Sequence, residues 1–144
     1  MIAARGVHHL AIQVRDLAVV ERFYREVLGL APLRRWPSAG GAGERSVWMD
    51  LGDGAFLALE VIAPGDGEED RSGDDDAGPR AGLHLLALRI GAAERGAWEE
   101  RLARAGVAVY HRTAFTLYVR DPEGNRVGLS HFPEADAGTA AERG

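Results

Sequence analysis

The chain has 144 residues, 46% of them hydrophobic and 27% charged, with a formal net charge of −5 and no cysteine. A chain of this length buries roughly two-thirds of its unfolded surface, so one compact domain is expected. The negative charge, without a basic stripe, argues against nucleic acid as a partner. The lack of cysteine excludes disulfides and thiolate metal sites. No apolar stretch reaches the roughly 20 residues of a membrane helix, and the start does not resemble a signal peptide, so we expect a cytoplasmic protein.

The first predicted elements are a strand at residues 6–14 and a helix that begins after Asp16 and ends at Gly29. Large aliphatic side chains alternate along the strand, which is typical of a sheet packed on one face. Neighbouring side chains on a strand point to opposite faces. We therefore expect His9 on the face without the aliphatics and His8 directed toward an edge or solvent.

Two further strands are predicted at residues 45–52 and 55–63, joined by a Gly-Asp-Gly turn. Glu60 is a charge within the second of these apolar strands. Such a group is seldom buried unless it is paired or bound to a metal. The following segment, residues 64–82, is acidic, rich in glycine and poor in large apolar side chains, so we expect a flexible linker.

The order of elements then repeats. A strand headed by His84 precedes a helix at residues 92–106 and three strands at residues 107–112, 115–121 and 125–132. His84 stands 75 positions after His9, and apolar helix positions match at the same offset. The repetition indicates a duplicated module.

Three possible metal ligands occupy matched places in the two halves. If the two sheets face one cup, His9, Glu60 and His84 can converge on one point. Two imidazoles and a carboxylate suit a divalent ion such as Fe, Mn, Ni, Co or Zn. The alternatives are hydrogen-bonded structural histidines and an ion pair between Glu60 and an arginine.

The runs "HHLAIQVRDL", "FYREVLGL", "LHLLALRI" and "LYVRDPEGNRVGL" resemble the vicinal oxygen chelate superfamily, which includes glyoxalases, bleomycin-resistance proteins and extradiol dioxygenases. The resemblance implies an α+β fold in which two βαβββ modules form a curled mixed sheet, a half-barrel cup with helices packed outside. It implies one domain over residues 1–144, with modules at 6–63 and 83–132 and a flexible tail at 133–144. It also implies a homodimer.

By the same resemblance His9, Glu60 and His84 match metal ligands, and Glu60 is the candidate catalytic carboxylate. The chain departs from the family pattern at Gly128, where members usually carry a glutamate. His131 follows on that strand but has the wrong parity for the cup, so we expect it at the surface or an interface. The candidate substrate-binding residues are Trp48, Phe56, His111, Thr116 and Tyr118.

Two functions follow from these residues. The first is a metal-dependent enzyme, of the lyase, isomerase or dioxygenase type, acting on a small substrate with neighbouring oxygens. The second is a metal-free protein that sequesters a small molecule, as antibiotic-resistance members of the family do. The missing carboxylate at Gly128 favours the second function, and the retention of His9, Glu60 and His84 favours the first.

Overall fold

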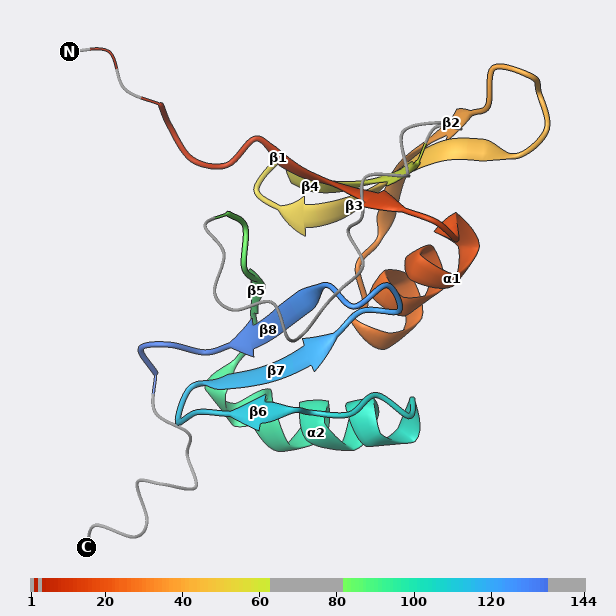
Figure 1. Ribbon diagram of the computed structural model, residues 1–144. Helices are drawn as coiled ribbons and strands as arrows, with labels where there is room; N and C mark the ends of the chain where they lie inside the picture. Colours follow the sequence, from red (N-terminus) through yellow and green to blue (C-terminus); the bar gives the residue numbers. More distant parts are fainter. Residues whose placement is uncertain (1, 3, 63–81, 135–144) are drawn as a thin grey trace, which may run out of the picture. The chain divides into compact units, whose positions relative to one another are not determined.

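The computed structural model describes residues 2, 4–62 and 82–134 and divides into two compact units, residues 1–72 and 73–144. Each unit contains one four-stranded sheet and its own helices (Figure 1). The predicted linker, apart from Gly82, and the tail beyond Glu134 lie outside the described residues. Within those residues, no helix has the length and apolar character needed to cross a membrane.

The sheet of the first unit has the strand order β1-β4-β3-β2. Strands β1 and β4 are parallel, and the other neighbours are antiparallel. The strands are β1 (His9–Val14), β2 (Pro32–Pro37), β3 (Glu44–Gly52) and β4 (Ala55–Val61). The turn between β3 and β4 contains Asp53 at φ 52° between two glycines of positive φ, as the predicted hairpin requires.

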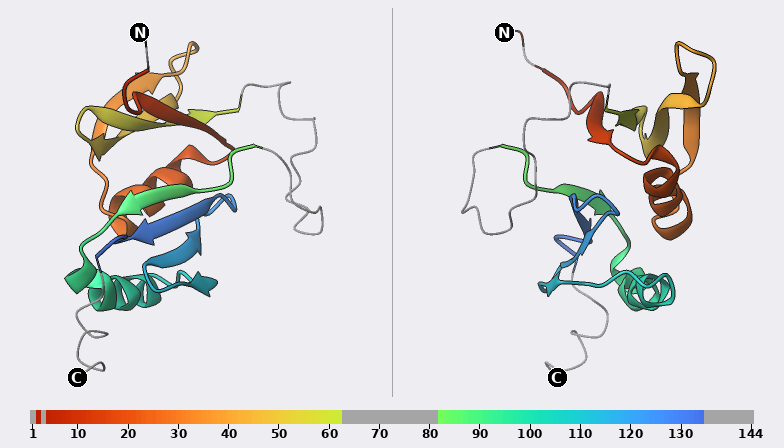
Figure 2. Two further views of the ribbon diagram at one scale, coloured as in Figure 1. Left: turned by 90° about the vertical axis from the view of Figure 1, so that its left-hand side faces the viewer. Right: turned by 45° about the vertical axis from the view of Figure 1, so that its right-hand side comes forward.

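Alternation along the strands divides this sheet into two different faces. One face is apolar, and its central residues, Val47, Met49, Leu57 and Leu59, are fully buried. Helix α1 (Leu17–Arg22) contacts β3 and β4. The other face includes His9, Gln13 and Glu60, which are all exposed. Figure 2 shows the helical segment on one side of this sheet only. The prediction of a sheet packed on one face is confirmed.

The first helix differs from the predicted continuous α-helix. Asp16 caps its start by accepting a hydrogen bond from the Val19 amide. From Phe23 the chain continues as a π-helical segment, η1 (Phe23–Val27), in which the Leu28 amide donates to the Phe23 carbonyl. The wider turn allows the consecutive Phe23 and Tyr24 both to be buried.

An ion network joins α1 to the edge strand β2. Glu21 on α1 is 7% exposed and accepts hydrogen bonds from the guanidinium groups of Arg35 on β2 and Arg25. Arg35 also pairs with Glu44 at 2.9 Å. The hydrogen bond from Arg35 lowers the pKa of Glu21, against the opposing effect of burial. The network fixes the helix against the sheet edge.

The second unit repeats the arrangement with the strand order β5-β8-β7-β6. Its strands are β5 (Leu86–Arg89), β6 (His111–Arg112), β7 (Thr116–Arg120) and β8 (Arg126–Ser130). The first and last strands in sequence, β5 and β8, are again parallel neighbours. The short η2 (Ala92–Glu94) leads into α2 (Arg95–Arg104), which lies along the sheet in Figure 2. The α+β class, with two mixed sheets, is confirmed.

Candidate functional site

A row of aromatic rings crosses the open face of the first sheet. His9 stacks on Phe56, its register partner, with ring centroids 4.9 Å apart and planes inclined by 6°. Phe56 stacks on Trp48 at 4.2 Å and 18°. Trp48 then contacts Trp36 on β2 at 5.3 Å. We call these four residues the aromatic row. All four strands contribute a ring to it: the first three rings are stacked, and Trp36 is tilted by 59° against Trp48.

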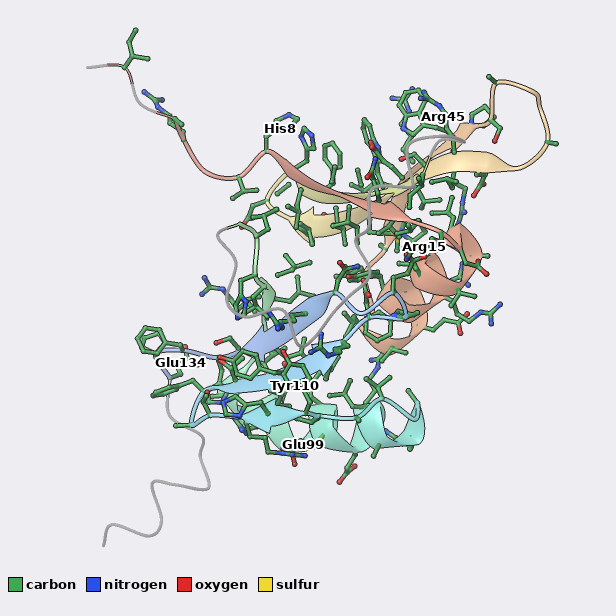
Figure 3. The ribbon with its side chains drawn as sticks, viewed as in Figure 1. His8, Arg15, Arg45, Glu99, Tyr110 and Glu134 are labelled. Carbon is green, nitrogen blue, oxygen red and sulfur yellow. The ribbon has the colours of Figure 1, made fainter. Side chains whose placement is uncertain are left out.

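Arginine side chains lie at the β2 end of the aromatic row. The guanidinium carbon of Arg34 lies 3.9 Å from the centre of the Trp36 ring, and that of Arg45 lies 5.7 Å from it. Figure 3 shows His8 and Arg45 toward opposite ends of this sheet. Stacked guanidinium groups extend the flat surface and give this end a positive charge.

His8 is exposed, as predicted, but its ring does not point away from that of His9. Their Nδ1 atoms lie 2.8 Å apart, and the His8 ring also contacts the edge of Phe56 at 5.7 Å. The physical reason is that β1 begins at His9, so His8 lies before the strand and is not bound by the alternation of its pleat. The expectation that His9 shares a face with Phe56 and Glu60 agrees with the strand register.

A cleft of about 440 Å³ opens at the other end of β4. It is lined by Ser38, Ala39, Glu44, Arg45, Ser46, Glu60, Val61 and Ile62. Glu60 is exposed here, and it forms no ion pair among the described residues, so the predicted pairing with an arginine is absent there. Its register partner on β3 is Ser46. The carboxylate is therefore available to a ligand.

Two buried polar atoms beside this cleft lack partners. The Ser46 hydroxyl, in a residue 5% exposed, and the Trp36 indole N–H find no hydrogen-bond partner among the described residues. Trp36 and Ser46 are register partners, so Trp36, Ser46 and Glu60 form one row across three strands. Buried donors are normally satisfied. Ser46 lines the cleft, so a polar group bound there would lie beside this residue.

The predicted binding residues of the second unit also share one sheet face. Thr116 is buried and donates to the Ser130 hydroxyl at 2.9 Å. Tyr118 lies between its partners Gly128 on β8 and His111 on β6, with the His111 ring 5.3 Å away. Gly128 is tightly surrounded, since an added Cβ would lie 3.2 Å from the Thr116 methyl carbon.

His84, at the head of the second module, has a cationic neighbour. A guanidinium nitrogen of Arg126 lies 2.7 Å from its Nδ1 atom. Arginine has no acceptor, so Nδ1 must accept this hydrogen bond. A neutral ring that accepts at Nδ1 carries its proton on Nε2, which leaves neither nitrogen with a free lone pair.

His131 is buried rather than at the surface, with 3% of its area exposed. Its Nδ1 donates to the Glu134 carbonyl, its Nε2 faces Arg95 at 3.2 Å, and its ring meets the edge of Phe115. The prediction of a surface or interface position is wrong because the chain folds back after β8 and covers the ring. His131 is thus held in place by contacts within the second unit.

Neither unit by itself forms a three-ligand metal site: no three His, Asp or Glu side chains gather among its described residues. His9 and Glu60 share a face, but their register partners place them four residues apart, roughly 13 Å along the strands. Ligating histidines usually donate their second N–H to a carboxylate or carbonyl. Arg126, by contrast, donates a hydrogen bond to His84 and cannot accept one from it.

Comparison with known proteins identifies the family. The model described as Glyoxalase/Bleomycin resistance protein/Dioxygenase superfamily matches residues 6–129. The chain belongs to this superfamily. An uncharacterized protein of Pseudomonas aeruginosa is 30% identical over 139 residues, 92% of this chain and 93% of that protein.

Solved structures of the superfamily include members of both functional kinds. A glyoxalase/dioxygenase from Nostoc punctiforme aligns with a TM-score of 0.72 and 24% identity, over 93% of this chain and 98% of that one. An antibiotic-binding protein from Streptomyces sp. CB03234 aligns with a TM-score of 0.62 and 24% identity, over 91% and 98%. These likenesses establish the fold and leave enzyme and binding protein as the two functional classes.

Several residues of the site have no counterpart in the sequence prediction. Strand β2, which carries Arg34 and Trp36, was not predicted because proline stands at both of its ends. Proline is tolerated in an edge strand, and β2 is the edge strand of its sheet. Ser46 gave no signal as an isolated serine. Arg126 resembled a solvated turn residue, although its parity with Gly128 placed it on the same face.

Proposed function

We propose that this protein binds a small planar aromatic molecule that carries a polar group, without a metal. The observation that carries the proposal is the aromatic row, His9, Phe56, Trp48 and Trp36, on the face of the sheet opposite α1. Aromatic pairs contribute about 0.5–1.5 kcal/mol each beyond their buried area. A flat ligand ring placed on this row would gain contacts of the same kind.

The polar end of the ligand is expected at the cleft beside the row. Ser46 and Trp36 offer hydrogen-bonding atoms without partners among the described residues, and Glu60 offers an accessible carboxylate. Pockets for small molecules combine an apolar wall with a few such polar groups. The proposed ligand therefore has a fused or extended ring system and a hydroxyl or amine donor for Glu60.

The test is a titration of the ¹⁵N-labelled protein with 2-naphthol, followed by the indole N–H resonances. We expect Trp36 and Trp48 to shift and Trp98, on α2, to remain unchanged. Phe56→Leu removes the central ring of the row and keeps an apolar side chain, so it should weaken binding about tenfold, the loss of one to two aromatic pairs. Trp98→Leu is the matched control. Equal shifts of all three indoles, or equal affinity in both variants, would refute the proposal.

The second candidate function is the metal-dependent enzyme that the family resemblance implies, with His9, Glu60 and His84 as ligands and Glu60 as the catalytic carboxylate. One observation favours it: His9 and Glu60 are both accessible on one face of β1 and β4. It requires His84 to be released from Arg126. Elemental analysis of protein purified without chelator, and calorimetric titration with Ni²⁺, Zn²⁺ or Fe²⁺, test it. Uptake that His9→Ala abolishes would support the enzyme.

A cytoplasmic location and a homodimer also remain proposals. Members of the superfamily often form dimers, which supports the homodimer. Light scattering at several protein concentrations distinguishes monomer from dimer. A monomer mass throughout would contradict the homodimer.

A further inference from the structure

The sheet of the second unit has an unusual charge. Its four strands contain four arginines, one histidine and no acidic residue, whereas the chain as a whole carries a net charge of −5. In the first unit the corresponding strands contain Glu44, Asp50 and Glu60. The two sheets therefore differ in electrostatic character although they share one topology.

The strand register gathers most of this charge on one face. Arg126 on β8 lies directly opposite Arg120 on β7, and Arg89 on β5 lies opposite Ser130. These residues share a face with Thr116 and Tyr118. Arg112 alone has the opposite parity, and it pairs with Glu99 on α2 at 3.0 Å. The register thus brings several guanidinium-bearing residues to one face of this sheet.

Arg126 differs from the other arginines of this face because its guanidinium lies beside an imidazole. Arg120 donates to the Gly124 carbonyl and lies 5.0 Å from the ring centre of Tyr110. Arg126 forms no ion pair with any carboxylate among the described residues; its hydrogen bond goes to His84 Nδ1. That bond places a proton on His84 Nε2. The pair thus presents one guanidinium and one imidazole N–H, which are both donors.

The strand residues of this face include hydrogen-bond donors and no carboxylate. Ser130 accepts from Thr116, so its own hydroxyl proton can be donated elsewhere. Gly128 stands between Arg126 and Ser130 on the same face and adds no side chain to it.

We infer that this face, centred on Arg126 and His84, binds an oxyanion: a phosphate, phosphonate or carboxylate group of a small molecule. A guanidinium fork and an N–H donor match the geometry of such groups. The inference does not rest on the proposed function, since it shares no residue with the aromatic row or its cleft. It assigns Arg126 and His84 to ligand binding rather than to a metal.

The experiment titrates the full-length ¹⁵N-labelled protein with inorganic phosphate at constant ionic strength and follows the amides of β5 and β8. We expect saturable shifts there, and binding about tenfold weaker in Arg126→Gln, since a hydrogen bond to a charged group is lost. Arg104→Gln, an exposed arginine in the last turn of α2, is the matched control. Equal affinity in the two variants, or no saturable shift in the wild type, would overturn the inference.

Two further measurements keep the result specific. The ¹⁵N resonances of the His84 ring should show the proton on Nε2, whereas a metal ligand at Nε2 requires the proton on Nδ1. Replacing phosphate by benzoate distinguishes the two sources of oxyanion: binding of either one, lost in Arg126→Gln, supports the site and names its preference. Displacement of phosphate by Zn²⁺ together with a change of the His84 tautomer would overturn it.

Discussion

The close packing around Gly128 gives a quantitative prediction about the missing carboxylate. An added Cβ would lie 3.2 Å from Thr116 Cγ2, 3.5 Å from Leu85 Cδ2 and 3.7 Å from Ala87 Cβ. The first distance is too short for an ordinary contact. Thr116 cannot rotate away freely, because its hydroxyl donates to Ser130 at 2.9 Å.

Gly128→Ala should therefore destabilise the protein. Overpacking a core typically costs about 1–3 kcal/mol, and replacing glycine by alanine returns about 0.4–1 kcal/mol through the unfolded chain. The expected net loss in the free energy of unfolding is about 1 kcal/mol. Gly40→Ala is the control, since a Cβ there meets nothing within 4 Å. It should leave stability unchanged or slightly raised.

The assay is urea unfolding followed by circular dichroism, applied to a double-mutant cycle. Thr116→Ser removes the offending methyl and keeps the hydroxyl, so Gly128→Ala should cost about 1 kcal/mol less in that background. A Gly128→Ala protein as stable as the wild type, or a cycle without coupling, would refute the packing argument. Confirmation would mean that a glutamate at this position requires Thr116 to change as well.

Three other predictions follow from single interactions. The hydrogen bond from Arg35 lowers the pKa of Glu21, so the ionised carboxylate stabilises the fold fully above its ordinary pKa of 4.5. This stabilisation is lost as the pH falls through the lowered pKa. The urea midpoint of Glu21→Gln should therefore lie below that of the wild type at neutral pH and converge with it in acid. Asp121→Ala should lower the free energy of unfolding by about 2–3 kcal/mol, because the buried carboxylate accepts the amides of Glu123 and Asn125; unchanged thermal unfolding would contradict this. Ser46→Ala should leave the melting temperature unchanged or raised, since it removes a buried hydroxyl without a partner, while weakening the binding of 2-naphthol; a clear loss of stability would show that the hydroxyl is satisfied in the folded protein.

Periodicity in the sequence was sufficient for most of the fold. Alternating aliphatic residues predicted the buried faces of β1 and β4. The Gly-Asp-Gly turn predicted the hairpin of β3 and β4, and Asp16 predicted the start of α1. These signals are local, so they survive without knowledge of the partner strands. The π-helical turn after Phe23 and the edge strand β2 were not predicted, because the first depends on burying two adjacent aromatic rings and the second on pairing with β3.

The candidate sites divide in the same way. The sequence by itself determined which residues of one strand share a face, since parity places His9 with Ala11 and Gln13, and Arg126 with Gly128. Only the tertiary structure decided what these faces are made of: cross-strand register stacks His9, Phe56 and Trp48 into one surface and brings Arg126 to His84. The physical reason is that strand register and side-chain hydrogen bonds depend on contacts between segments that are distant in sequence. Whether a histidine offers a lone pair or a proton depends on whether its neighbour donates or accepts a hydrogen bond.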